Sequence, residues 1–284
     1  MLSGLFSKNV PMFNSTKSFN VSKLHALILD MDGVLWRDKT LLGDLPSIFN
    51  TIDDLGLQVI MATNNASRSP AQYVDKLAHF GVKIESWQVI TSADATAYYL
   101  KNQFPEGGDV YIVGEESLKK TITTFGFNPD GNHPVAVVAG LDRGINYQKM
   151  TEATLLIRKG VPFIGTNPDK SFPILEGEAP GAGAFLAALE AATGVSPVIM
   201  GKPEPIMFKL ALERLAVTPE ETLVVGDRLE TDIQGAQNAG CFSALVLSGV
   251  TTSESAKLWQ PPPQIISPDM TSLLAKLAME RNAI

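Results

Sequence analysis

The chain has 284 residues, 45% of them hydrophobic and 19% charged, which is enough to bury a large core spread over roughly two domains. Its 23 Lys and Arg against 30 Asp and Glu give a net charge of −7 with no basic run, which argues against nucleic acid or an anionic membrane as a partner. The single cysteine excludes an internal disulfide and suits a reducing compartment, so we expect a cytoplasmic protein.

The first 22 residues are treated apart from the rest because they are rich in Ser and Asn and contain no acidic residue. Their apolar stretches are interrupted, unlike the centre of a signal peptide, and they lack the arginines of a mitochondrial presequence. We expect a flexible extension over residues 1–22, with a weak targeting segment as the alternative. The chain contains no run of about 18 apolar residues, so we expect no membrane span.

Short apolar runs alternate with longer segments of helical period from Leu24 onward, which is typical of a parallel α/β sheet joined by crossover helices. The runs are continuous rather than alternating, as strands covered on both faces should be. The strands we predict are Leu24–Leu29, Gln58–Ala62, Val110–Val113, Val135–Ala139, Pro162–Gly165, Pro197–Met200, Thr222–Val225, Ser243–Leu247 and a short last one at Gln264–Ile266.

Capping residues mark the ends of several predicted helices. Ser69 and Pro70 are typical of a helix start, and Gly81 of its end. Thr218 followed by Glu221 predicts a capping-box turn just before an apolar strand.

The first predicted strand ends in Asp30-Met-Asp32-Gly33, and ligands of parallel sheets bind outside the carboxyl ends of the strands. Side chains two residues apart begin on the same side of an extended chain, so both carboxylates can address one reacting centre. One could attack as a nucleophile while the other transfers a proton. The alternative is a solvated acidic turn. We expect the nearby Trp36 to pack beneath this loop.

Two further strands end in polar residues. One ends in Thr63, Asn64 and Asn65, whose neutral donors can hold an oxyanion, although these residue types are also ordinary turn formers. The other is followed by Gly201 and Lys202, and a desolvated ammonium there can neutralise a phosphate. A solvated surface lysine is the alternative, and no glycine-rich Walker loop precedes it.

The fourth polar strand end carries Asp227 and, five residues later, Asp232. Surroundings rich in oxygen and free of imidazole favour Mg²⁺, which typically binds through one or two carboxylates and a substrate phosphate. A capped start of the short helix that Gly240 ends is the alternative.

In this order, the polar strand ends resemble the haloacid dehalogenase-like (HAD-like) phosphatase superfamily. The segments Asp-Met-Asp-Gly-Val-Leu-Trp, Thr-Asn-Asn, Gly-Lys-Pro-Glu-Pro and Gly-Thr-Asn-Pro-Asp look like its branch of capped phosphatases, typified by nitrophenylphosphatase, phosphoglycolate phosphatase and NagD-type nucleotidase. The resemblance covers Leu24 to about Val250. It implies a doubly wound parallel-sheet core with a smaller inserted α/β cap.

The resemblance also implies a role for each matching residue. Asp30 would be the nucleophile that forms an aspartyl phosphate, and Asp32 the acid and base. Mg²⁺ would bind the Asp30 carboxylate, the Asp32 backbone carbonyl and the Asp227 carboxylate. Phosphate and substrate contacts would come from Thr63, Asn64, Asn65 and Lys202, with Asp232 orienting Lys202 or a metal-bound water.

The cap that the resemblance implies would span residues 106–195, between core segments 23–105 and 196–284. Its loop from Thr166 to Pro173, with Asn167 and Asp169, and the turn Leu141-Asp142-Arg143 are expected to point toward the substrate, with outer-surface loops as the alternative. Members of this branch often pair through the cap, which leaves the oligomeric state open with a homodimer through the cap as one candidate.

The function we predict is Mg²⁺-dependent hydrolysis of a small phosphate monoester. p-Nitrophenyl phosphate would be a generic substrate, and phosphoglycolate, glycerol or sugar phosphates, nucleoside monophosphates and pyridoxal phosphate are candidates. A phosphomutase or phosphotransferase of the same fold is an alternative, whereas a dehalogenase would have no use for Asp32 or Asp227. A receiver domain or a phosphometabolite sensor without turnover belongs to a different class, and a phosphate-release assay separates them.

Overall fold

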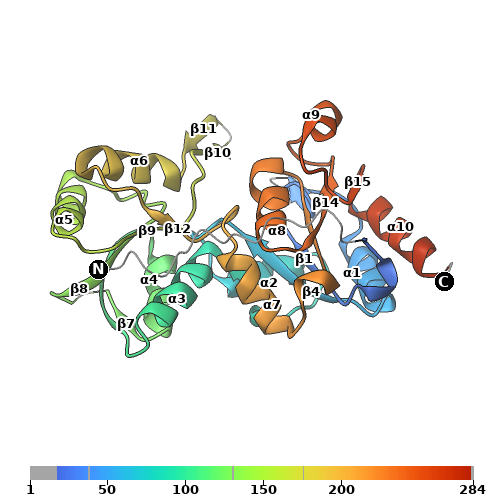
Figure 1. The fold of residues 1–284 in the computed structure, drawn as a ribbon, viewed down its shortest axis with the longest axis horizontal. Helices are drawn as coiled ribbons and strands as arrows, with labels where there is room; N and C mark the ends of the chain where they lie inside the picture. Colours follow the sequence, from blue (N-terminus) through green and yellow to red (C-terminus); the bar gives the residue numbers. More distant parts are fainter. Residues whose placement is uncertain (1–17, 38, 130, 175, 283–284) are drawn as a thin grey trace. The chain divides into compact units, whose positions relative to one another are not determined.

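The computed structural model describes residues 18–37, 39–129, 131–174 and 176–282 (Figure 1). The chain divides into two compact units, Met1–Met61 with Leu212–Ile284, and Ala62–Ala211. Both contain helices and parallel strands, so the predicted α/β class is confirmed. The predicted cap limits, 106–195, stay a prediction. The two units divide at Ala62 and at Leu212, and this division does not test those limits.

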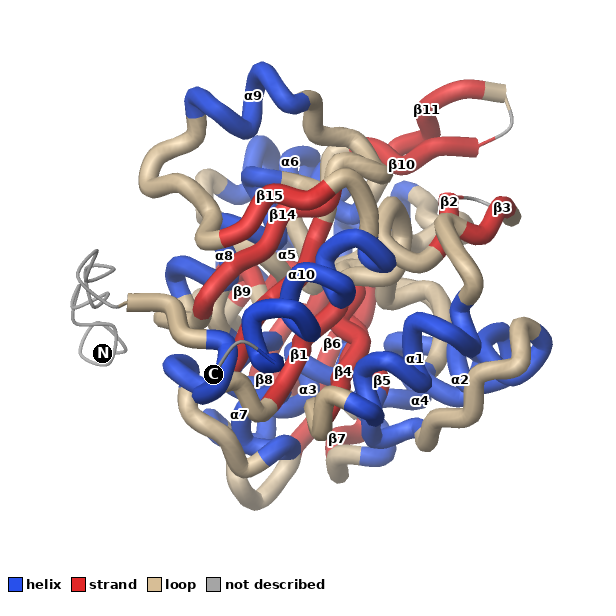
Figure 2. The backbone as a smooth tube through the Cα atoms, turned by 90° about the vertical axis from the view of Figure 1, so that its right-hand side faces the viewer, coloured by secondary structure: helices blue, strands red, loops and turns tan. Residues whose placement is uncertain are grey.

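The larger sheet has six strands in the order β15-β14-β13-β1-β4-β5. Figure 2 shows β15 and β14 side by side in this sheet. The pairs β1–β13, β1–β4, β13–β14 and β14–β15 are all parallel. Every residue of β1 and β13 is buried, as expected for strands covered on both faces. The strands are β1 Ala26–Leu29, β4 Gln58–Thr63, β5 Val89–Thr91, β13 Thr222–Gly226, β14 Phe242–Val246 and β15 Ile265–Ser267.

Helices of the first unit cover both faces of its strands. In Figure 1, α8 lies on one side of these strands and α1 and α10 on the other, where α1 packs against α10. The elements are the 3-10 turns η1 Val21–Lys23 and η3 Pro219–Glu221, the helices α1 Leu45–Asp54, α8 Gln234–Asn238, α9 Ser253–Leu258 and α10 Met270–Asn282, the π-helical turn η4 Leu229–Ile233, and the hairpin β2 Trp36–Arg37 and β3 Thr40–Leu41. Helix α7 Ile206–Leu215 crosses from the second unit into the first.

The second unit contains a five-stranded parallel sheet in the order β12-β9-β8-β6-β7. Helices α5 and α6 pack together and, with β6, β8 and β9, enclose an apolar core that includes Val137, Ile157 and Leu189. The elements are α2 Pro70–His79, the turn η2 Ser86–Gln88, α3 Ser92–Gln103, β6 Gly108–Val113, α4 Glu116–Thr124, β7 Phe127–Asn128, β8 Pro134–Ala139, α5 Tyr147–Arg158, β9 Phe163–Gly165, the hairpin β10 Ser171–Ile174 and β11 Gly177–Pro180, α6 Ala182–Thr193 and β12 Val198–Ile199.

The predicted caps are confirmed. Ser69 and Gln72 form a capping box at the start of α2, and Thr218 and Glu221 form one at η3. Gly240, just after α8, has a φ of +77°, a left-handed conformation that favours glycine.

Most of the expected N-terminal extension, residues 1–22, lies outside the described residues. In the part that is described, Asn20 caps η1, and the Phe19 ring meets the Phe242 ring edge-on with centroids 5.1 Å apart. Across the described ranges, we find no helix with the length and apolarity that a bilayer crossing requires.

Candidate active site

The register of the larger sheet brings two aspartates to neighbouring strand ends. Leu29 of β1 pairs with Val225 of β13, so Asp30 follows one strand and Asp227 follows the other close to the same level. The Asp30 N–H donates to the Val225 carbonyl at 2.8 Å, which continues the ladder to the last residue before the turn. Two carboxylates far apart in the sequence therefore meet at one edge of the sheet.

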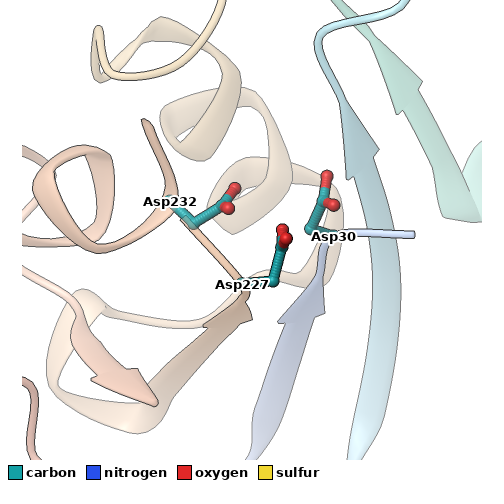
Figure 3. A group of neighbouring side chains, drawn as sticks. All are labelled: Asp30, Asp227 and Asp232. Carbon is teal, nitrogen blue, oxygen red and sulfur yellow. The ribbon is translucent and has the colours of Figure 1, made fainter. Parts of the chain in front are cut away.

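Asp30, Asp227 and Asp232 form an acidic cluster in the first unit (Figure 3). One carboxylate oxygen from each lies within 4.8 Å of the other two. Asp227 and Asp232 are both buried. Asp232 belongs to the turn η4, and the Arg228 N–H donates to its Oδ2 at 3.1 Å.

Glycines allow the backbone to close around this acidic cluster. A Cβ on Gly33, whose φ is +86°, would lie 2.4 Å from Asp227 Oδ2, and a Cβ on Gly226 would lie 2.1 Å from the Cβ of Asp232. The Val250 N–H donates to Asp227 Oδ2 at 2.8 Å. The Asp227 carboxylate is thus held by the loop after β14 as well as by its own strand.

The donors of the acidic cluster fit a hard divalent cation. All three ligand atoms are carboxylate oxygens, those of Asp227 and Asp232 belong to buried residues, and a bound cation would offset the repulsion between like charges this close. Oxygen ligands without imidazole or thiolate suit Mg²⁺. The structure brings together the predicted ligands Asp30 and Asp227 and adds the carboxylate of Asp232, which the sequence placed in a supporting role.

The Asp32 carboxylate is held by an indole. Its Oδ1 accepts a hydrogen bond from Trp36 Nε1 at 2.9 Å. Trp36 is buried, as predicted, while Asp32 is exposed. Packing of this tryptophan was predicted from its position, whereas its hydrogen bond was not.

Lys202 is tied to the end of β4 in the second unit. Asn64 Oδ1 accepts from the Lys202 N–H at 2.7 Å, and Asn64 Nδ2 donates to the Lys202 carbonyl at 3.0 Å. Lys202 Nζ donates to the Ala62 carbonyl at 3.0 Å. A Cβ on Gly201 would lie 2.5 Å from Asn64 Oδ1, so only glycine allows this close approach. The alternative of a solvated surface lysine is therefore excluded, since Lys202 is buried.

The loop after β9 also forms hydrogen bonds with Asn64, the residue that binds Lys202. Asn64 Nδ2 also donates to Asp169 Oδ1 at 3.2 Å, and Asn167 Nδ2 donates to the Asn64 carbonyl at 2.8 Å. The same carbonyl accepts from Ser92 Oγ at 2.6 Å. Ser92, at the start of α3, was missed by the sequence analysis, and its only signal is its place directly after a short apolar run.

Thr63 and Asn65 form a tight turn at the end of β4. The Asn65 N–H donates to Thr63 Oγ1 at 3.2 Å, and Asn65 Oδ1 accepts from the Ser67 N–H at 2.8 Å. Thr63 is buried and Asn65 half-buried. Their predicted contacts with phosphate stay predictions.

We call Lys202, Asn64, Ser92, Asn167 and Asp169 the Lys202 cluster. Charged groups lie close to it in the sequence and in the turn Leu141-Asp142-Arg143. Burial raises the pKa of Glu204, two residues after Lys202. In the turn of the predicted cap, Asp142 binds Lys149 at 2.8 Å, and Arg143 pairs with Glu115 at 2.6 Å. The acidic cluster belongs to the first unit and the Lys202 cluster to the second, and their union in one site stays a prediction.

Comparison with known proteins identifies the family on two segments of the chain. The model of haloacid dehalogenase-like hydrolases matches residues 27–128, and a second model described as HAD-hydrolase-like matches residues 199–273. These segments contain the predicted residues at all four polar strand ends.

Relatives of known name match most of the chain. The 5'-nucleotidase YutF of Bacillus subtilis is 37% identical over 80% of this chain and 88% of its own length. The acid sugar phosphatase of Staphylococcus aureus is 35% identical over 89% of this chain and 97% of its own. The crystal structure of 4-nitrophenylphosphatase from Thermotoga maritima matches with a TM-score of 0.84 and 34% identity, covering 90% of this chain and 98% of that one.

Proposed function

This chain belongs to the haloacid dehalogenase-like hydrolase family. We propose that Asp30 is the nucleophile that accepts the phosphoryl group of the substrate in a Mg²⁺-dependent site. The chain is a phosphoric monoester hydrolase of the nitrophenylphosphatase and nucleotidase branch. The observation that carries the proposal is the meeting of the Asp30 and Asp227 carboxylates, which follow adjacent strands, with the Asp232 carboxylate of η4.

In the proposed reaction, Asp30 attacks the phosphorus and the ester oxygen leaves. Asp32 gives its proton to the leaving oxygen, which departs as an alcohol. Asp32 then takes a proton from water, whose oxygen attacks the aspartyl phosphate and releases inorganic phosphate and the free Asp30 carboxylate. Two in-line displacements thus replace one difficult step.

The acidic cluster would repel a phosphate, so a positive charge is needed beside it before the substrate can bind. Asp30, Asp227 and the Asp32 carbonyl would hold Mg²⁺, with Asp232 beside them, and the cation would offset the charge of the carboxylates and the phosphoryl oxygens. Lys202 would supply a second positive charge, and its hydrogen bonds to Asn64 and Ala62 restrict where that charge can lie. Thr63 and Asn65 would donate to the phosphoryl oxygens.

The substrate class we propose is a small phosphorylated metabolite, such as a nucleoside monophosphate or a sugar phosphate. The names of the relatives, a 5'-nucleotidase and an acid sugar phosphatase, support these two classes. Loops of the second unit, including Asn167 and Asp169, would contribute to the choice between them.

A phosphate-release screen over a panel of metabolites tests the proposal, with Mg²⁺ present and with the cation removed by chelation. We expect release from p-nitrophenyl phosphate and from at least one nucleoside or sugar phosphate, and only with Mg²⁺. Binding without release would point to a sensor, and transfer of phosphate to an added alcohol rather than water would point to a phosphotransferase. Either result would reject the proposed hydrolysis.

Asn64 is expected to act through Lys202, because its side-chain amide binds both the N–H and the carbonyl of that residue. Asn64→Ala should lower kcat/KM about tenfold, and the further loss in a Lys202→Ala background should be less than about twofold. Kinetics of the wild type, both single variants and the double variant measure this coupling.

Asn102→Ala, which truncates an exposed asparagine of the same unit, is the matched control and should leave the rates unchanged. Losses that simply multiply in the Asn64/Lys202 double variant would show that Asn64 acts independently of Lys202.

A further inference from the structure

The hydrogen bond between Trp36 and Asp32 links a buried aromatic residue to the proposed acid and base. Trp36 Nε1 donates to Asp32 Oδ1 at 2.9 Å across four residues of the turn that follows β1. The proposed mechanism uses Asp32 and gives Trp36 no part. Asp32 is exposed, so its carboxylate would otherwise have freedom to rotate.

The backbone around Trp36 is fixed from several directions. The Gly33 N–H donates to the Trp36 carbonyl at 2.7 Å, and the Trp36 N–H donates to the Met31 carbonyl at 3.3 Å. Trp36 also pairs with Leu41 in the β2–β3 hairpin. With its side chain only 1% exposed, the indole is a rigid donor.

An indole N–H can donate but cannot accept a hydrogen bond. Asp32 Oδ1 must therefore offer a lone pair to Trp36 whether or not the carboxyl group is protonated. When Asp32 carries a proton, the bond to Trp36 directs that proton to the other oxygen, Oδ2. One hydrogen bond thus makes the two carboxylate oxygens chemically different.

We propose that Trp36 is the positioning residue of Asp32, with its indole fixing Oδ1 and leaving Oδ2 to exchange the proton with the leaving group. This inference rests on the proposed hydrolysis with Asp32 as acid and base. A general acid must lie within hydrogen-bond reach of the oxygen that it protonates, and a misplacement of about 1 Å can cost about a hundredfold in rate.

The dependence of rate on the leaving group tests this assignment. A poor leaving group such as the alkoxide of glycerol phosphate needs the proton of Asp32, whereas p-nitrophenolate leaves with little help. Trp36→Phe keeps a ring but removes the donor. It should lower kcat/KM, which reports the steps up to release of the alcohol, about tenfold to a hundredfold for glycerol phosphate and less than about threefold for p-nitrophenyl phosphate. Phenyl phosphate should fall between them.

Trp87→Phe is the matched control, because Trp87 Nε1 donates to the Glu85 carboxylate at 3.2 Å in an exposed turn. Its rates should equal those of the wild type for all three substrates. Equal losses in kcat/KM for all three substrates in Trp36→Phe would mean that Trp36 serves packing alone, and would overturn the inference. Absence of phosphate release by the wild type would instead reject the proposed hydrolysis.

The indole N–H resonance of Trp36 gives a second test, independent of turnover and of the folding of Trp36→Phe. The chain has three tryptophans, so ¹⁵N labelling with Trp87→Phe and Trp259→Phe assigns all the signals. Asp32→Ala should shift the Trp36 signal and leave those of Trp87 and Trp259 in place. An unmoved Trp36 signal would overturn the inference.

Discussion

Asp30→Asn should reduce phosphate release from p-nitrophenyl phosphate on the order of 10⁴-fold or more. The carboxamide has nearly the shape of the carboxylate but is too weak a nucleophile to form the aspartyl phosphate. The backbone N–H of residue 30 can still donate to the Val225 carbonyl, so the end of β1 should be preserved. Steady-state kinetics in Mg²⁺ buffer measure the loss.

Asp53→Asn serves as the control for Asp30→Asn. Asp53 lies exposed on α1 in the same unit, and its replacement removes the same unit of charge. It should retain wild-type kinetics, and both variants should unfold cooperatively near the wild-type temperature. Wild-type turnover by Asp30→Asn would reject Asp30 as the nucleophile.

Asp227→Asn should lower kcat/KM on the order of a hundredfold and abolish the stabilisation of the fold by Mg²⁺. In the wild type, Mg²⁺ at about a hundred times its Kd adds about 2.7 kcal/mol, which corresponds to a rise in Tm of roughly 5 °C. The variant loses one of three clustered carboxylates, so its Tm should respond far less. Thermal unfolding with and without Mg²⁺ measures this difference.

The Tm of the wild type in chelator is the reference for this comparison, and Asp53→Asn should show the full response to Mg²⁺. Repulsion among the three carboxylates is relieved either by the cation or by loss of one charge. A full Mg²⁺-induced rise in the Tm of Asp227→Asn would place the cation elsewhere in the chain.

The strands of both sheets could be predicted where the chain runs through the interior. The run Thr222–Val225 was predicted and β13 is observed at Thr222–Gly226, because strands covered on both faces give unbroken apolar runs. The three-residue strand β5, Val89–Thr91, was missed since it leads directly into α3. The β10–β11 hairpin was missed because its second strand, Gly-Glu-Ala-Pro, is mostly exposed and contains no apolar run.

The acidic cluster could be predicted in part. Asp30 and Asp227 each follow an apolar strand, and the sequence therefore indicated their edge of the sheet. The position of Asp232 depends on the π-helical turn η4 and on the missing side chain of Gly226, neither of which periodicity reveals. The Asp232 carboxylate was consequently expected to orient Lys202 or a metal-bound water, and not to lie beside the carboxylates of Asp30 and Asp227.

Contacts made by side-chain orientation could not be predicted. The bonds of the Asn64 amide to Lys202 and Asp169 were not predicted, and its expected contact with phosphate stays a prediction. The bond from Trp36 to Asp32 likewise depends on the turn between them. Residue types and spacing indicate which side chains can react, but their rotamers decide which side chains form hydrogen bonds with each other.

Identification of the phosphorylated residue tests the central claim most directly. The enzyme is mixed with substrate in Mg²⁺, quenched in acid within one turnover, and reduced with borohydride, which converts an aspartyl phosphate to homoserine. Mass spectrometry of the peptides should find homoserine at position 30, and none there in Asp30→Asn. Homoserine at another aspartate, or phosphate release with an unmodified Asp30 throughout, would contradict the account.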